Sequence, residues 1–320
     1  MKGKQLCGLV LASLLVLSGC SSTVKEDGKY VIASIDGENF LADDVYSSLS
    51  SSASGSALLF DYVLQQIIQE NFPVTDDMKE NASQIVENIE ANYESTYGDD
   101  YEEQLSSDLA YQSYDDMDAY EDALIDSLQY SEFIKKYVKD NFDTVYDDYY
   151  KKESPRIISL IKVSMSDVDT PTESESEKLE EVKKLLKTNK SFGDIAASYS
   201  DDDSSSAKGN IGVVDSTSDL ASTYGDDVET KALSLKAGEV SEAIQGDDGY
   251  YFLYCQSTDK DTIKEELKTV DLDSPLLVYD DYILYMAFNT YELTYKDEEV
   301  EKQIKQIVDE ALEARNGGES

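Results

Sequence analysis

The fold is decided by a stretch that reads SFGDIAASYSDDDSSSAKGNIG over residues 191–212 and KALSLKAGEVSEAIQGDDGYYFLY over residues 231–254. Its first part combines a short helical pattern, an acidic loop and a β-rich segment flanked by glycines. Its second part predicts a helix over 228–235, a turn at 236–241, and strands over 240–244 and 250–255. A β-rich run at 156–163 and an amphipathic helix at 174–187 precede them. Together they predict a small sheet with helices packed on it, in a chain without histidine.

The composition is strongly acidic. The chain of 320 residues carries 68 acidic and 27 basic side chains, for a net charge of −41. Nucleic acid and anionic lipid surfaces would repel such a chain, so nucleic-acid binding is excluded. Hydrophobic residues make up 40% of the chain and include 24 tyrosines, which is enough to build folded cores. The length allows two domains.

The N-terminus has the pattern of an export signal. Lys2 and Lys4 precede an apolar run at 9–17, which is too short to span a bilayer as a helix. The run ends in Leu17-Ser18-Gly19-Cys20, which resembles the bacterial lipobox. The resemblance implies cleavage before Cys20 and acylation of its sulfur, with palmitate as one of the chains. The alternative is an ordinary secretory signal in which Cys20 has no role.

Cysteine usage leaves one thiol in the folded part. Cys7 would leave with the signal and Cys20 would be lipidated, so Cys255 has no partner for an intramolecular disulfide. Cys255 falls in an alternating strand pattern, where we expect it to be a small buried hydrophobe rather than a reactive thiol.

Helical patterns dominate on both sides of the central stretch. On the N-terminal side, a strand-turn unit at 30–40 is followed by apolar stripes at helical spacing, and Thr75 caps one of these helices. On the C-terminal side, the same spacing returns over 261–315. The sequence therefore predicts a mostly helical region that is interrupted by the α+β segment.

These segments resemble a known family. ASIDGENFLADDVY (33–46), FDYVLQQIIQENFPVTDD (60–77), YGDDYEEQL (97–105) and DDMDAYEDALIDSLQ (115–129) look like the N-terminal region of PrsA-type foldases. These are lipoproteins of Gram-positive bacteria, and the chain is also similar to SurA. The central stretch resembles their parvulin-type peptidyl-prolyl isomerase (rotamase) domain through Gly209, Gly212, the segment KAGEVS (236–241) and Gly249-Tyr250.

The resemblance implies an α+β fold with a discontinuous, mostly helical chaperone domain. A parvulin-like domain, a four-stranded sheet wrapped by helices, is inserted into it. The expected parts are a signal peptide (1–19), a tether (20–28), an N-terminal helical region (29–153), the parvulin-like domain (154–258), C-terminal helices that pack on the N-terminal region (259–315) and a tail (316–320).

Site residues follow from the resemblance position by position. Asp202 falls where the family has cysteine or aspartate, and Ser159 and Tyr251 fall on its two histidine positions. The Ser159 and Tyr251 hydroxyls would then replace the network of the imidazoles. Tyr224 and Val228, with Leu233 nearby, fall on the pocket that receives the proline ring.

Each of these residues also has a structural interpretation. Asp202 belongs to a run, DDDSSS (201–206), that is typical of a solvated loop. Ser159 and Tyr251 are strand residues whose hydroxyls could serve core hydrogen bonds alone. Tyr224 and Val228, four residues apart, are spaced for ordinary helix packing.

The sequence and the resemblance together predict a foldase attached by a lipid on Cys20 to the extracytoplasmic face of the cell membrane. Its partners would be unfolded or partly folded secreted polypeptides, and a homodimer is left open. The alternatives are a holding chaperone whose parvulin-like domain only binds peptide, and a surface lipoprotein that binds something else.

Other chemistries find no support in the sequence. Without histidine there is neither a Ser-His-Asp arrangement nor an imidazole metal site. The acidic clusters at 99–100, 147–148 and 201–203 lack the ligand spacing of an EF-hand loop. Glycine-rich phosphate loops are absent as well. No metal and no cofactor are therefore predicted.

Overall fold

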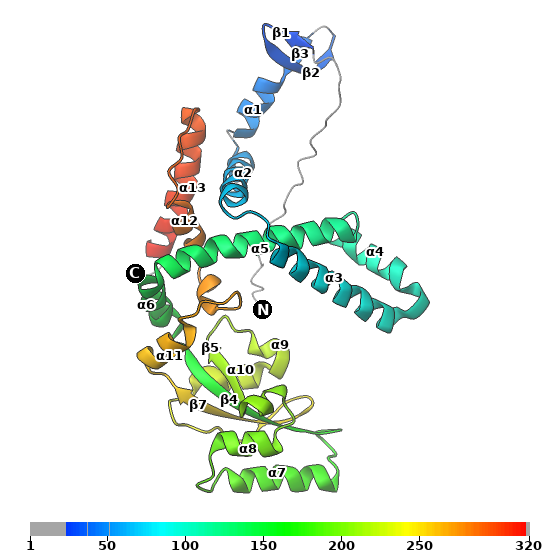
Figure 1. Cartoon of the computed structure of the whole chain (residues 1–320), viewed down its shortest axis with the longest axis vertical. Coiled ribbons are helices and arrows are strands. Elements are labelled where there is room, and N and C mark those ends of the chain that lie inside the picture. Colours follow the sequence, from blue (N-terminus) through cyan, green and yellow to red (C-terminus); the bar gives the residue numbers. More distant parts are fainter. Residues whose placement is uncertain (1–23, 37, 51, 318–320) are drawn as a thin grey trace. The chain divides into compact units, whose positions relative to one another are not determined.

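The structure is a computed structural model that describes residues 24–36, 38–50 and 52–317. The predicted signal peptide and Cys20 lie outside these residues. The chain divides into two compact units, which are described separately below (Figure 1). The first contains the residues up to Ile134 together with those from Leu284 onward, and the second is Lys135–Ile283. The second unit thus includes residues on both sides of the predicted parvulin-like segment, 154–258.

The first unit begins with a small antiparallel sheet, in the order β1-β2-β3. Its N-terminal elements are β1 (Lys25–Glu26), β2 (Lys29–Ile35), β3 (Glu38–Leu41), α1 (Ala42–Ser50), α2 (Ala53–Asn71), α3 (Asp76–Tyr97), α4 (Tyr101–Tyr111) and the first part of α5 (Met117–Asp140). Thr75 caps α3, because its side chain accepts a hydrogen bond from the Met78 backbone N–H at 3.2 Å. This confirms the predicted cap.

The C-terminal helices of the first unit lie against its N-terminal part. They are the end of α12 (Tyr282–Phe288) and α13 (Glu298–Gly317), and α13 packs on α2. The ring of Phe60, on α2, lies 4.9 Å from that of Phe288, so an aromatic contact joins segments far apart in the sequence. Helix α13 extends to residue 317, two residues into the predicted tail, and residues 318–320 lie outside the description.

The second unit is built on a four-stranded antiparallel sheet in the order β5-β4-β7-β6. The strands are β4 (Arg156–Ser164), β5 (Asn210–Val214), β6 (Ile244–Gln245) and β7 (Gly249–Ser257). The α+β class and the four-stranded sheet are therefore confirmed. The strand predicted over 240–244 is wrong in its extent, because Val240 makes only a single bridge with Tyr254 and the ladder starts at Ile244.

The two faces of this sheet are covered by different helices. One face, here called the α10 face, packs against α9 (Leu220–Tyr224) and α10 (Asp226–Ser234). The other, the α7–α8 face, packs against α7 (Glu173–Leu185) and α8 (Phe192–Tyr199). Successive strand residues point to opposite faces. On β4, Ile158 and Leu160 accordingly join the α10 face, whereas Ile161 joins the α7–α8 face. Cys255 is fully buried on the α10 face, as predicted.

Tyrosines of α6 (Phe142–Glu153) join this helix to the rest of the second unit. Tyr146 donates a hydrogen bond to the Lys260 carbonyl at 2.5 Å, at the start of α11 (Lys260–Leu267). Tyr149 donates to the buried carboxylate of Asp215, beyond the end of β5. These bonds satisfy buried polar groups. They explain why α6 and α11 belong to the same compact unit as the sheet.

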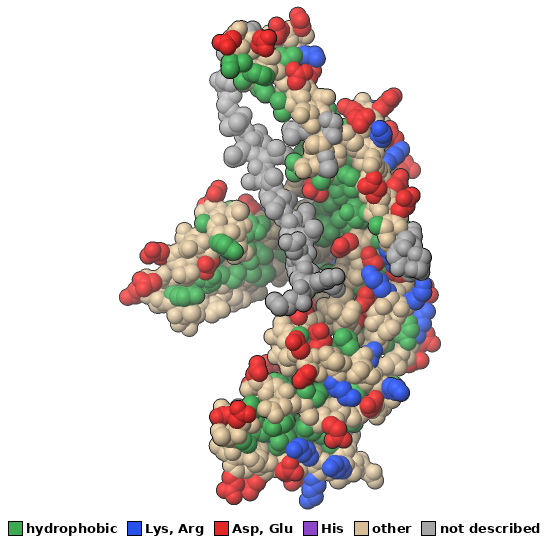
Figure 2. Space-filling view, turned by 180° about the vertical axis from the view of Figure 1, so that it is seen from behind, with side chains coloured by type: hydrophobic (Ala, Val, Ile, Leu, Met, Phe, Trp, Pro, Cys, Tyr) green, Lys and Arg blue, Asp and Glu red, His purple; other side chains and the backbone are tan. Residues whose placement is uncertain are grey.

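Acidic side chains are spread over the surface of both units on the face seen in Figure 2. Among the residues that the structure describes, no helix combines the length and the apolar character needed to cross a membrane.

Candidate functional site

Tyr251 lies at the centre of the α10 face. It pairs with Lys162 across the β4–β7 ladder and is only 2% exposed. Its hydroxyl donates a hydrogen bond to Oδ1 of Asp248 at 2.5 Å, and Nζ of Lys162 lies 2.5 Å from the other oxygen, Oδ2. One carboxylate thus joins the buried hydroxyl to a lysine.

The protonation of these groups follows from their surroundings. Burial makes the largest contribution to raising the pKa of Tyr251 above its ordinary value, and the hydrogen bond to Asp248 makes the next largest. The hydrogen bonds from Lys162 and then from Tyr251 lower the pKa of the Asp248 carboxyl. At neutral pH, Tyr251 is therefore a neutral donor and Asp248 an anionic acceptor.

Tyr224 forms the next member of this arrangement. It ends α9 and is half-buried, with its ring 5.9 Å from that of Tyr251 in an edge-to-face arrangement. Such a geometry is favourable because the positive edge of one ring meets the negative face of the other. Burial raises the pKa of Tyr224 most, and the nearby negative charge of Asp202 raises it further. Tyr224 thus connects the buried Tyr251 to the acidic loop.

Asp202 occupies the N-cap position of the short helix η2 (Asp203–Ala207). Its Oδ1 accepts hydrogen bonds from the Ser204 backbone N–H at 2.9 Å and from the Ser204 hydroxyl at 2.5 Å. The neighbouring Asp201 is engaged elsewhere, since its carboxylate pairs with Lys178 at 2.5 Å. The loop therefore directs Asp202, and not Asp201, toward Tyr224.

The predicted pocket residues surround one apolar cluster. Val228 is 1% exposed and lies in the core of the α10 face, while Leu233 and Tyr224 are partly buried and pack against that core. Val228 thus forms the floor of the predicted pocket, and Tyr224 is more accessible than Val228. The structure brings Tyr224, Val228, Leu233 and Tyr251 together on one face, with Asp202 at its edge.

Ser159 lies on the opposite face of the sheet. It pairs with Tyr254 across the ladder, is 3% exposed, and accepts a hydrogen bond from Nε2 of Gln256 at 2.7 Å. The predicted network of the Ser159 and Tyr251 hydroxyls is therefore not formed, because the sheet separates them. Its two neighbours on β4, Ile158 and Leu160, both join the cluster that contains Tyr251.

Gly209 shows why the loop before β5 needs glycine at this position. Its φ of +80° is a conformation that side-chain-bearing residues rarely adopt. A Cβ atom there would also come within 2.5 Å of the Leu160 carbonyl oxygen and 2.9 Å of the Ala196 Cβ. Gly209 thus allows the acidic loop to approach β4 closely.

Sequence reasoning missed Lys162 and Asp248. Lys162 interrupts an apolar strand, and strict alternation from Ile158 through Leu160 would have placed it on the α10 face. Asp248 lies three residues before Tyr251 in a turn that had no assigned role. The signal was a lysine placed between buried apolar residues, Ile161 and Val163, in the interior of this strand.

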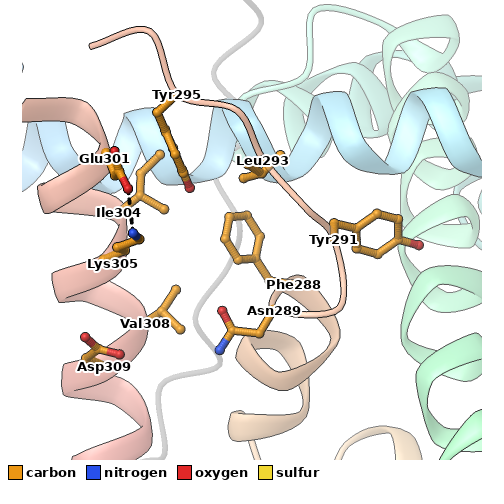
Figure 3. A pocket seen from close by; sticks show the side chains of 10 residues that line it. All are labelled: Phe288, Asn289, Tyr291, Leu293, Tyr295, Glu301, Ile304, Lys305, Val308 and Asp309. Atoms are coloured by element: carbon orange, nitrogen blue, oxygen red, sulfur yellow. Dashed lines mark hydrogen bonds and ion pairs between the residues drawn. The ribbon is translucent and has the colours of Figure 1, made fainter. Parts of the chain in front are cut away.

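A separate cavity of about 180 Å³ lies within the first unit (Figure 3). The end of α12, the following segment and α13 form it, and Glu301 and Lys305 make an ion pair of 2.5 Å at its wall. None of the predicted site residues contributes to this cavity. Its lining residues are Phe288, Asn289, Tyr291, Leu293, Tyr295, Glu301, Ile304, Lys305, Val308 and Asp309.

Acidic residues do not gather into a metal site within the part of the chain that the structure describes. No group of three or more aspartate, glutamate or cysteine side chains there is placed to hold a metal ion. On the α10 face, Lys162, Asp248 and Tyr251 instead satisfy one another. Their arrangement offers an aromatic and aliphatic wall beside a carboxylate, which suits the binding of an apolar ring next to an amide.

Comparisons with known proteins show which family the chain is similar to. Residues 160–257 match the family described as rotamase, the PPIC-type PPIase domain. The foldase protein PrsA of Bacillus subtilis (strain 168) is 28% identical over 285 residues, which cover 86% of this chain and 84% of the relative. PrsA of Staphylococcus aureus (strain Newman) is 25% identical over 318 residues, covering 97% and 94%.

Solved structures include similar chains. The crystal structure of PrsA from Bacillus subtilis has 22% sequence identity and a TM-score of 0.40, and covers 86% of this chain and 98% of its own. The sequence comparisons support a PrsA-type foldase with a PPIC-type PPIase domain, and the resemblance stated from the sequence is confirmed.

Proposed function

We propose that this chain is an extracytoplasmic foldase whose parvulin-like domain, residues 154–258, isomerises X-Pro peptide bonds in secreted polypeptides. The helical domain, residues 29–153 and 259–315, receives the unfolded or partly folded client. A lipid on Cys20 attaches the protein to the membrane. Replacing Cys20 with alanine is expected to release the protein into the medium, and retention of this variant in the membrane fraction would contradict the anchor.

The reaction requires no bond to a side chain. Isomerisation is rotation about the X-Pro amide against a barrier of roughly 18–20 kcal/mol, and no proton needs to move. A site can therefore act by binding the twisted amide better than the planar one. A thousandfold acceleration corresponds to about 4 kcal/mol of such preferential binding. Preferential binding of this size does not require a histidine.

The observation that carries the proposal is the position of Tyr224. This half-buried ring packs against the apolar cluster of the α10 face, and the negative charge of Asp202 lies near its hydroxyl, within the segment that matches the PPIase family. A proline ring can pack on the exposed part of such a wall, and the carboxylate next to it lies within reach of the amide. Asp202, Tyr224, Val228 and Leu233 are the residues we assign to this site, with Tyr251 below them.

A protease-coupled assay on an Ala-Pro tetrapeptide tests the proposal. We expect the wild type to accelerate isomerisation and Tyr224→Ala to lower kcat/KM by roughly tenfold, because the variant loses one wall of the pocket. Tyr199→Ala is the matched control, since Tyr199 is an equally half-buried tyrosine that packs on the α7–α8 face. Equal losses in the two variants would contradict the assignment.

A holding chaperone is the second candidate, and the burial of Tyr251 favours it. A residue that is 2% exposed cannot contact a bound peptide without rearrangement, and Ser159 lies on the other face. This alternative predicts suppression of client aggregation without any change in the rate of isomerisation. If neither activity appears, the third interpretation, a surface lipoprotein with a different ligand, gains support.

A further inference from the structure

The ion pair between Lys162 and Asp248 lies at one end of a continuous chain of polar and aromatic contacts. Nζ of Lys162 is 2.5 Å from Oδ2 of Asp248 and 5.8 Å from the centroid of the Tyr251 ring. Oδ1 of Asp248 accepts the Tyr251 hydroxyl at 2.5 Å. The Tyr251 ring then meets Tyr224, whose hydroxyl lies near the negative charge of Asp202. The chain thus runs from an exposed carboxylate, through a buried ring, to the half-buried edge of the proposed pocket.

The turn that carries Asp248 is fixed by its backbone as well. The Gly246 N–H donates to the Gly249 carbonyl at 2.9 Å, and the Met165 N–H donates to the Asp248 carbonyl at the same distance. At Gly246, a Cβ atom would come within 2.7 Å of Cε2 of Tyr251. The turn therefore closes directly on the tyrosine ring. These contacts restrict the movement of Asp248 away from the Tyr251 hydroxyl, whose hydrogen bond it accepts.

We propose that Lys162 and Asp248 are positioning residues of the isomerase site, which hold Tyr251 in the orientation that supports Tyr224. The inference rests on the proposed function of the α10 face. Lys162 keeps the Asp248 carboxylate in place, and Asp248 fixes the hydroxyl and hence the ring of Tyr251. With the ring fixed, its edge-to-face contact sets the angle of the Tyr224 wall. This arrangement takes the place of an imidazole network.

The pH dependence of the rate distinguishes this arrangement from one based on histidine. The charged and titratable groups that face Tyr251 are Lys162 from β4, Asp248 from the turn, Tyr224 from α9, and Asp202 from the acidic loop, with Asp203 next to Tyr224. The pKa of Asp248 is lowered and those of both tyrosines are raised. Histidine, whose ordinary pKa is near 6.5, is absent from the chain. The rate should therefore be flat between about pH 5.5 and 8.5.

The opposite face of the sheet supplies a matched control. Lys183 lies 5.9 Å from the centroid of the Tyr250 ring and pairs with Glu180 at 2.9 Å. It is therefore also a lysine with a carboxylate partner over a tyrosine of β7. Lys183→Met removes the same kinds of contact as Lys162→Met, but on the α7–α8 face.

The test compares kcat/KM of the full mature chain for an Ala-Pro tetrapeptide from pH 5.5 to 8.5. We expect Lys162→Met and Asp248→Asn each to lower kcat/KM roughly three- to tenfold. Because both residues act through the same ion pair, the double variant should be no less active than the less active of the two single variants. Lys162→Arg should stay within about twofold of the wild type, because it restores the charge. Lys183→Met should match the wild type. Thermal unfolding of each variant shows whether a loss reflects unfolding.

Three results would overturn the inference. The first is that Lys162→Met and Asp248→Asn behave like Lys183→Met, and the second is that the wild-type rate changes with an apparent pKa between 6 and 8. If the wild type shows no turnover at all, the catalytic part of the proposed function fails on its own. The inference is then tested by the affinity for the same peptide, which should weaken in Lys162→Met and Asp248→Asn only. Equal affinity in all variants, or no binding, is the third overturning result.

Discussion

The two faces of the four-stranded sheet are built alike in their cores but differ in their polar groups. On each face a tyrosine of β7 lies beneath a lysine, Tyr251 with Lys162 and Tyr250 with Lys183, at 5.8 and 5.9 Å. The Tyr251 hydroxyl is donated to a carboxylate at 2.5 Å, whereas that of Tyr250 donates to the amide oxygen of Gln245 at 3.3 Å. Tyr251 is buried and Tyr250 is half-buried.

This difference teaches that a packed core does not by itself make a site. The α7–α8 face buries Ile161, Val163 and Phe252 as completely as the α10 face buries Leu160 and Leu253. Only on the α10 face, among the residues described, do contacts lead from a buried hydroxyl to a half-buried ring next to an acidic loop. The function is therefore expected to depend on the α10 face, and stability on both.

The largest effect is expected from emptying the core of the α7–α8 face. Phe252 is 2% exposed, so Phe252→Ala should lower the free energy of unfolding by about 3–5 kcal/mol. The proposed site does not include this residue, so kcat/KM per folded molecule should be unchanged. Urea unfolding and the isomerase assay at low temperature measure the two quantities. A loss of activity in the folded fraction would contradict the expectation that function depends on the α10 face and not on the α7–α8 face.

An intermediate effect is expected from removing one hydroxyl on each face. Tyr251→Phe takes a charge-assisted hydrogen bond from Asp248 and should cost about 1–3 kcal/mol of stability, together with a several-fold loss of kcat/KM. Tyr250→Phe removes a longer bond at a half-buried side chain and should cost less than about 0.5 kcal/mol. Similar losses of stability in both variants would show that the hydrogen bond of Tyr251 on the α10 face contributes no more than that of Tyr250.

The smallest effect is expected at the start of α7. Hydrogen bonds from the backbone N–H and side chain of Thr172 lower the pKa of Glu175 from its ordinary 4.5 to about 2. Because the folded pKa is depressed, the ionised form stabilises the fold above pH 4.5, and this contribution is lost as the pH falls toward 2. Glu175→Gln should therefore be less stable than the wild type at pH 7.

Urea midpoints measured from pH 7 to pH 2 check this expectation, with the exposed Glu177→Gln on the same helix as the control. The difference between the wild type and Glu175→Gln should shrink below pH 4.5 and close near pH 2. A difference that stays constant over this range would contradict the role of the Glu175 charge. Activity should not change in either variant, since α7 covers the face without the site.

The sequence could predict those features that follow from local patterns. Alternation over 250–255 placed β7 and the burial of Cys255, and the Thr75 cap placed the start of α3. The resemblance supplied the four-stranded sheet and the gathering of Tyr224, Val228 and Tyr251. These features depend on spacing along one element or on positions shared with relatives.

What the sequence could not supply depends on register. A strand residue changes face when its position shifts by one, so Ser159 was placed beside Tyr251 although the β4–β7 ladder puts it on the other side. Lys162 and Asp248 are 86 residues apart, and their contact exists only when β4 and the turn before β7 meet. No local pattern records such a contact.

Refolding of a secreted protein without disulfides, whose slow phase is limited by proline isomerisation, tests the central claim most directly. Uncatalysed, such a phase takes tens of seconds. We predict that the wild-type chain shortens it in proportion to the chain's concentration, equally at pH 6 and pH 8, and that Tyr224→Ala largely loses this effect. A slow phase that is unchanged by the wild type, while aggregation of the same protein is suppressed, would contradict the claim and leave a holding chaperone.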